Sequence, residues 1–214
     1  MGNKANPIGL RLANTLAWED TVFVRSKDYA QFVKLSIAIR AFLSQKYNEF
    51  GLLSINIVQK RNIYAIIVNV INVDMFLFSS GQSVTQIESE VRTNIWSDID
   101  LIVNQPQNIE SHPGFIASKL IADIALRASI KSSVRQSFKT ISTSGVLGLK
   151  ASYSGRIYGV DIAQTTWHLE GRIPLSTLSA DIKYASVYVK TNYGICNVKV
   201  WVCLAEASIK YNNE

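Results

Sequence analysis

Four positively charged side chains recur at intervals of four residues and could hold the phosphates of a nucleic acid. They are Arg127, Lys131, Arg135 and Lys139. Side chains four positions apart on a helix lie above one another, so the spacing predicts a cationic stripe along one helical edge. Because no Asp or Glu occurs in residues 125–159, we expect no acid to neutralise the stripe. The mutual repulsion would be relieved by a polyanion, and a solvated helix face is the alternative interpretation.

Residues that could perform catalysis or bind a metal are scarce. His112 and His168 are the only histidines, and there is neither a G-x-S-x-G motif nor a phosphate-binding glycine loop. Cys196 and Cys203 are an odd number of positions apart in a strand-like segment, so their side chains would point to opposite faces. We therefore expect no disulfide, no metal, no cofactor and no enzymatic activity.

The composition is typical of a globular protein with a polyanionic partner. With 214 residues, 48% of them hydrophobic, the chain can bury one good core or two modest ones of roughly 100 residues each. A net charge of +6 favours a nucleic acid or an acidic membrane as partner. The most hydrophobic stretch, residues 63–78, is too short to cross a bilayer. A membrane-surface scaffold would need a broad exposed apolar helix face, whereas two cores account for the hydrophobic residues, so we expect no membrane partner.

The amino-terminal half predicts a small α+β domain after a basic arm that contains Lys4 and Arg11. Residues 29–47 and 84–96 have helical spacing, residues 52–59 and 62–70 predict a strand hairpin, and residues 99–103 predict a third strand. The first helix is expected to place on one face Phe32, Val33, Ile37, Leu43 and Tyr47. Residues 105–114 contain two prolines and a glycine and are the candidate linker, so the arm and first domain would span residues 1–104.

The carboxy-terminal half, residues 115–214, predicts a second α+β domain. Residues 115–140 have helical character, with Ser129 as a candidate break, and would display the cationic stripe. Strand-like segments follow at 147–153, 160–166, 181–185 and 197–204, the last alternating valines against Lys199 and Trp201. We expect the helices to pack on a mostly antiparallel sheet.

The opening residues, MGNKANPIGLRL, resemble the amino-terminal signature of the bacterial-type small-subunit ribosomal protein three family. The resemblance returns in SGR at 154–156, DIA at 161–163, Trp167, EGRIPLSTL at 170–178, ADI at 180–182, YG at 193–194 and VKVW at 198–201. These blocks keep the family's order and cover essentially the whole chain. The resemblance implies an amino-terminal type II K-homology domain followed by a mixed α/β domain. It also implies a structural role in the head of the small ribosomal subunit, near the messenger entrance.

The resemblance also implies where RNA would bind. K-homology domains clamp single-stranded RNA with a G-x-x-G loop, which corresponds by position to Phe78, Ser79, Ser80 and Gly81. Only the final glycine is present and hydroxyls replace the usual lysines, so we expect this degenerate loop to bind RNA poorly. The family's messenger-facing basic cluster falls on Lys131, Ser132 and Arg135. The cations expected on ribosomal phosphates are Lys4, Arg11, Lys150, Arg156 and Arg172.

The partners implied by the resemblance are small-subunit ribosomal RNA, messenger RNA and neighbouring head proteins. Bacterial relatives are usually more basic, and the abundance of Ile, Asn and Tyr is expected from an AT-rich organellar genome. We therefore expect the mitochondrial matrix, in the mitoribosome, with the plastid stroma and the bacterial cytoplasm as alternatives. The alternative function is a free K-homology RNA-binding regulator, which would be expected to keep a basic G-x-x-G loop.

Overall fold

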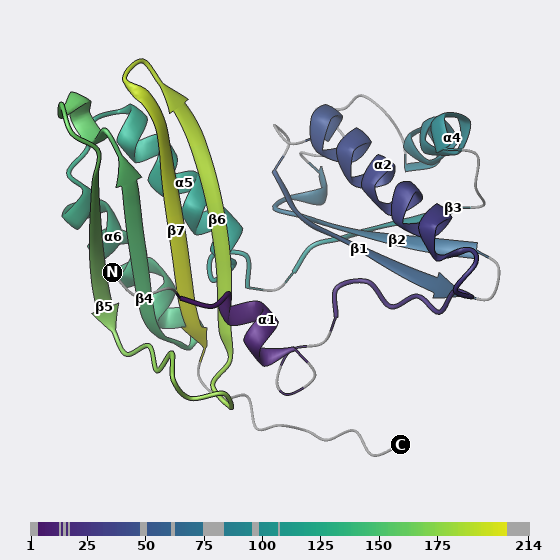
Figure 1. Ribbon diagram of the computed structural model, residues 1–214, viewed down its shortest axis with the longest axis horizontal. Coiled ribbons are helices and arrows are strands. Elements are labelled where there is room, and N and C mark those ends of the chain that lie inside the picture. Colours follow the sequence, from purple (N-terminus) through teal and green to yellow (C-terminus); the bar gives the residue numbers. More distant parts are fainter. Residues whose placement is uncertain are drawn as a thin grey trace. The chain divides into compact units, whose positions relative to one another are not determined.

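The chain folds into two compact units (Figure 1). The computed structural model describes residues 4–12, 14, 16, 18–47, 51–60, 63–74, 84–95, 99–106 and 108–204. The central unit comprises Trp18–Ile109, and the terminal unit combines Met1–Ala17 with Glu110–Glu214. The division between them falls inside the expected linker, residues 105–114. The arm, however, belongs with the carboxy-terminal part, so the expectation that it joins the first domain is wrong.

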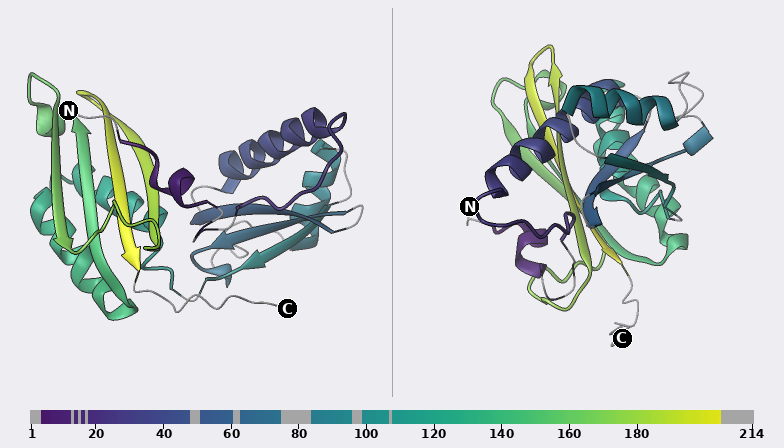
Figure 2. Two further views of the ribbon diagram at one scale, coloured as in Figure 1. Left: turned by 60° about the horizontal axis from the view of Figure 1, so that its bottom comes forward. Right: turned by 90° about the vertical axis from the view of Figure 1, so that its right-hand side faces the viewer.

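In its described residues, the central unit has a three-stranded sheet covered by α2 and α4. Its elements are α2 (Tyr29–Tyr47), β1 (Leu52–Lys60), β2 (Ile63–Val70), α4 (Val84–Ile95) and β3 (Ile99–Asn104). The sheet order is β1-β2-β3, with β1 antiparallel and β3 parallel to β2. Both helices lie on the same side of the sheet (Figure 2). They share one core, in which Ile39 and Leu43 of α2 and Ile87 and Val91 of α4 are buried with Ile66.

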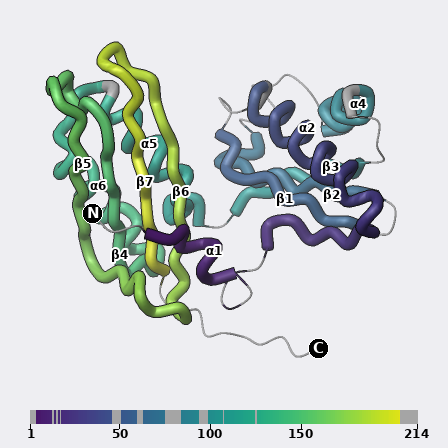
Figure 3. Tube along the Cα trace, in the orientation of Figure 1, coloured from purple at the N-terminus to yellow at the C-terminus, as the bar shows by residue number. Residues whose placement is uncertain are grey.

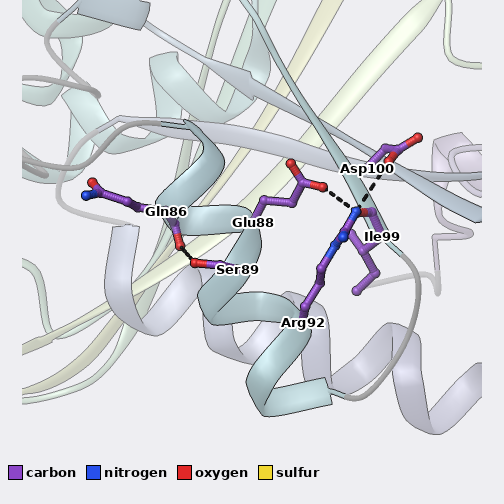
Figure 4. A network of polar contacts seen from close by, with 6 residues as sticks. All are labelled: Gln86, Glu88, Ser89, Arg92, Ile99 and Asp100. Carbon is purple, nitrogen blue, oxygen red and sulfur yellow. Dashed lines mark hydrogen bonds and ion pairs between the residues drawn. The ribbon is translucent and has the colours of Figure 1, made fainter.

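Arg92 fastens α4 to β3 (Figure 4). Its Nε and Nη2 atoms donate hydrogen bonds of 3.0 and 2.8 Å to the carbonyl oxygen of Ile99. Nη2 also lies 2.6 Å from Glu88, one turn earlier on α4, and 3.6 Å from Asp100. These acids therefore belong to a structural polar network.

The terminal unit is a four-stranded antiparallel sheet with helices. Its helices are α1 (Pro7–Arg11), α5 (Pro113–Ala125) and α6 (Ile130–Ile141), and its strands are β4 (Val146–Gly155), β5 (Gln164–Gly171), β6 (Ile182–Thr191) and β7 (Gly194–Leu204). The short 3-10 turns η2 (Ser142–Ser144) and η3 (Ile157–Gly159) flank β4. The strand order is β5-β4-β7-β6. The predicted α+β class with helices on an antiparallel sheet is confirmed, although the strand expected at 160–166 begins only at Gln164.

The two faces of this sheet differ. On the inner face, Leu149, Ala151 and Val200 pack with Leu120 of α5 and Val134 of α6 in one buried core. Figure 2 shows α5 and α6 on this side and the amino-terminal segment on the other. The amino-terminal segment crosses the outer face beside β7 and β6, as the tube in Figure 3 shows. Helix α1 packs there against β6.

The expected helix 115–140 is two helices, broken where Ser129 predicted it. Helix α5 ends at Ala125, and Ser129 occupies the N-cap position of α6. Between them, Arg127 has a left-handed backbone with φ of 58°. The hydroxyl of Tyr158 in η3 donates a hydrogen bond to the carbonyl oxygen of Ala128. This bond ties the turn between the helices to the turn that follows β4.

His112 caps the amino-terminal end of α5. Its Nδ1 atom accepts a hydrogen bond of 3.3 Å from the backbone N–H of Gly114, and Pro113 occupies the first helical position. Burial, helped by the positive charge of Lys183, lowers the pKa of His112 from 6.5 to about 4. The folded protein therefore keeps this imidazole neutral, so that Nδ1 remains an acceptor.

Acidification should weaken this cap. The unfolded chain takes up a proton at His112 near pH 6.5 and the folded chain only near pH 4, so the stabilisation is complete above pH 6.5 and is lost as the pH falls through about 4. We expect His112→Asn, which keeps a capping acceptor that does not titrate, to remove roughly 2 kcal/mol of this pH dependence. Urea unfolding at several pH values would measure it. Parallel curves for the two proteins would contradict the expectation.

Candidate nucleic-acid interface

Helix α6 presents cations to solvent along one edge. Lys131, Arg135 and Lys139 are exposed, whereas Val134 and Ile141 are buried against the sheet. The spacing of four residues places the three cations above one another, as expected. Ser132, which the resemblance placed between the two messenger-facing cations, is also exposed. We call Lys131, Arg135 and Lys139 the α6 stripe.

The α6 stripe differs from the expectation in two respects. Arg127 does not lie on the helix, because α6 begins at Ile130 and Arg127 is in the turn before it. Its predicted place in the stripe is therefore wrong, although the residue is exposed. The second difference is an acid from a distant strand: Nε of Arg135 lies 3.6 Å from Oε1 of Glu170 on β5. The Arg135 side chain is 68% exposed, so this ion pair is weak and can exchange for a phosphate.

Arg11 was expected on ribosomal phosphates, and this expectation is wrong. The residue is fully buried in the terminal unit. Its guanidinium donates hydrogen bonds of 2.9 to 3.2 Å to four backbone carbonyl oxygens, those of Pro7, Leu175, Thr177 and Ala180. The planar fork of donors thus joins α1 to the segment between β5 and β6. Arg11 holds the arm on the sheet.

Lys4 and Lys150 come together on the outer face of the terminal sheet. Lys4 is exposed, and Lys150 is half-buried on β4, with its Nζ 5.2 Å from the ring centroid of Trp167 and 5.5 Å from that of Trp201. Burial, and to a smaller extent the charge of Lys4, lowers the pKa of Lys150. Two cations near one another, without an acid between them, form a favourable place for an anion.

Arg156 and Arg172 lie near opposite ends of the antiparallel pair formed by β4 and β5. Arg156 follows β4, where its Nε donates a 2.8 Å hydrogen bond to the carbonyl oxygen of Val160 and its Nη2 lies 3.8 Å from Asp161. Arg172 follows β5 and is exposed, and its backbone N–H donates to Leu147. Both arginines remain accessible to a phosphate.

The remaining expectations concern the degenerate loop, the two cysteines, metal ligands and membrane-spanning helices. Phe78, Ser79, Ser80 and Gly81 lie outside the described residues. Cys196 and Cys203 are buried free thiols. Among the residues that the structure describes, no three His, Cys, Asp or Glu side chains are grouped as metal ligands would be. None of the helices formed by these residues has the length and apolar character needed to cross a membrane.

The sequence interpretation missed the aromatic residues around Lys150. The alternation in residues 197–204 places Lys199 and Trp201 opposite the buried valines and could have predicted half of this surface. The other half required the pairing of β5 with β4, in which Trp167 lies opposite Ser152.

Comparisons with known proteins identify the family. The family model described as ribosomal protein S3, C-terminal domain, matches residues 116–202. The small ribosomal subunit protein uS3c of Ostreococcus tauri is 32% identical over 217 residues, covering 97% of this chain and 100% of that protein. The uS3 protein of Wolbachia sp. subsp. Brugia malayi is 30% identical, covering 94% and 98%, and that of Roseobacter denitrificans is 27% identical, covering 96% and 88%. The chain therefore belongs to the uS3 family of small-subunit ribosomal proteins.

Proposed function

We propose that this protein is a structural constituent of the small ribosomal subunit that binds ribosomal RNA and contacts incoming messenger RNA. It acts by binding and performs no catalysis, in keeping with its family. The observation that supports the messenger contact is the α6 stripe, which consists of three exposed cations, one of which, Arg135, makes a loose ion pair with Glu170. Such an edge can hold the phosphates of a strand that passes along it.

The contacts to ribosomal RNA are distributed over the terminal unit. We assign them to Lys4, Lys150, Arg156 and Arg172, with Arg127 and Lys139 flanking the messenger-facing pair, Lys131 and Arg135. Arg11 is left out because it is buried. Each exposed contact contributes modestly, and together they make the binding strongly dependent on salt.

The central unit is proposed to be a type II K-homology domain with a structural role. The order α2, β1, β2, α4, β3, with β3 parallel to β2, is consistent with this fold. The degenerate loop at Phe78 to Gly81 lacks the first glycine and the lysines that would hold a phosphate backbone. The head of the small subunit, beside its neighbouring proteins, is the proposed location, and the mitochondrial matrix is the proposed compartment. Relatives include the uS3 of Roseobacter denitrificans and the uS3c of Ostreococcus tauri, and plastid and bacterial ribosomes are the alternatives.

Sedimentation with salt washes tests the ribosomal role. The tagged protein should comigrate with small subunits, and Arg156→Ala with Arg172→Ala should be released at lower salt, with roughly fivefold weaker retention. The matched control is Lys27→Ala with Lys34→Ala, which removes two exposed cations from the central unit. A wholly free pool of wild-type protein would favour the free regulator and overturn the proposal. If the wild type and the arginine variant resist salt equally, Arg156 and Arg172 do not contact ribosomal RNA.

A further inference from the structure

The outer face of the terminal sheet carries large aromatic side chains and lysines next to one another. Because Leu149, Ala151, Val198 and Val200 point into the core, the alternating residues of β4 and β7 point outward. The strand register places Trp201 opposite both Lys150 and Tyr184, and Lys199 opposite Ser152, which is itself opposite Trp167. We call this surface the aromatic–lysine face, consisting of Lys150, Trp167, Tyr184, Tyr188, Lys199 and Trp201.

Several of these rings are accessible from solvent. Trp167 is 60% and Tyr188 is 76% exposed. Trp201 packs against Tyr184 with ring centroids 5.4 Å apart, and the Nζ of Lys150 lies 5.5 Å from the centroid of its ring. Such an exposed group of flat rings, on a face that α5 and α6 do not cover, indicates a binding surface.

The charge of this face is of one sign. Strands β4, β6 and β7, which lie wholly within the described residues, contain no Asp or Glu. The single acid of β5, Glu170, has the opposite orientation to Trp167 along the strand and reaches Arg135 of α6. Lys4 adds a cation close enough to Lys150 to lower the pKa of that side chain. A partner must therefore supply negative charge together with flat or apolar groups.

We propose that the aromatic–lysine face binds an unpaired segment of RNA, with bases stacked on Trp167 and Tyr188 and phosphates held by Lys4, Lys150 and Lys199. The inference rests on the proposed RNA-binding role and adds a stacking surface separate from the α6 stripe. Trp167 lies on β5 and Tyr188 on β6, the two edge strands of the sheet. These strands are three strand spacings, or roughly 14 Å, apart. A sheet of this width can seat about two or three bases, as other RNA-binding sheets do.

RNA fits this surface better than a protein does. Every base has a flat face that stacks on an indole or phenol ring, and every nucleotide brings a phosphate for a lysine. A protein partner would have to provide carboxylates opposite Lys4, Lys150 and Lys199 while also covering exposed rings. An acidic protein is the competing occupant that the experiment separates from RNA.

Titration of the full-length protein with an unstructured fluorescein-labelled 12-nucleotide RNA tests the inference. We expect Trp167→Ala with Tyr188→Ala to raise the dissociation constant at least tenfold, because base stacking on each ring is lost. The single variant Trp167→Phe, which keeps an aromatic ring at this position and retains Tyr188, should bind the RNA with most of the wild-type affinity. The matched control is Trp18→Ala, which removes a tryptophan that is 64% exposed in the central unit and should leave binding unchanged. Equal affinity of wild type and the double variant would overturn the inference.

Ultraviolet cross-linking in assembled small subunits distinguishes the inference from the proposed function. RNA cross-linked to peptides from β5 and β6 supports the stacking surface. If wild-type protein cosediments with small subunits but these peptides cross-link to a protein, the stacking surface is wrong and the ribosomal role stands. If wild-type protein fails to cosediment, the ribosomal role is wrong, and the oligonucleotide titration still decides whether this face binds RNA.

Discussion

Replacing Arg11 by alanine is expected to lower the free energy of unfolding of the terminal unit by roughly 3 to 5 kcal/mol. The residue is fully buried, and the substitution would leave the carbonyl oxygens of Leu175, Thr177 and Ala180 without the donor that they share. Hydrogen bonds from a charged donor contribute more than neutral ones, and the vacated volume adds a cavity. The arm should then detach from the outer face of the sheet.

Urea unfolding of the full-length chain, followed by circular dichroism, would measure this loss. Arg11→Lys should recover only part of the stability, because an ammonium group cannot span the carbonyl oxygens that the planar guanidinium reaches. Arg172→Ala is the matched control, since it removes an exposed arginine from the same unit and should change stability by less than about 0.5 kcal/mol. Equal unfolding midpoints for Arg11→Ala and Arg172→Ala would show that the buried guanidinium is not a stabilising element.

Lys131→Ala combined with Arg135→Ala should slow translation through a stable messenger hairpin roughly fivefold, while unstructured messages are translated at nearly the normal rate. This follows from the proposed function, in which the α6 stripe would hold the phosphates of strands that have just separated and so bias movement past the hairpin. Both side chains are exposed, so neither folding nor assembly should suffer. A reconstituted translation system with paired hairpin and linear messages would measure the two rates.

Two controls decide how this second result is interpreted. Lys27→Ala with Lys34→Ala removes the same charge from the central unit and should leave both messages unaffected. Equal slowing of both messages by the α6 variant, or failure of its assembly into subunits, would instead place Lys131 and Arg135 on ribosomal RNA.

The long helices were predictable because their apolar residues repeat at helical spacing over several turns. Helix α4 has apolar residues at intervals of three or four, and its predicted range of 84–96 differs from Val84–Ile95 by one residue. Helix α2 was predicted over its full length. Its predicted face was right at Leu43, which is buried, but wrong at Ile37, which is 62% exposed, and it omitted Ile39, which is buried. Apolar residues occur around much of α2, so periodicity alone does not choose the face that packs.

The roles of single charged residues were less predictable because their partners are distant in sequence. Arg11 finds three of its four acceptors 164 to 169 positions away, and those acceptors are backbone carbonyls that no side-chain pattern reveals. Arg135 meets Glu170 only because α6 packs beside β5. The exposed spacing of the α6 stripe, in contrast, is local and could be predicted from helical geometry.

The Arg11 contacts also constrain the order in which the chain can fold during its synthesis. The arm is made before both folded units, whereas the carbonyls at 175–180 and the strands β6 and β7 that form its docking surface are made after the central unit, α5 and α6. The central unit, by contrast, has all of its described elements between Tyr29 and Asn104, so it can fold while most of its partner unit is still unmade. The arm must stay undocked through most of translation, and closing this long loop is expected to be the late, slow step in maturation.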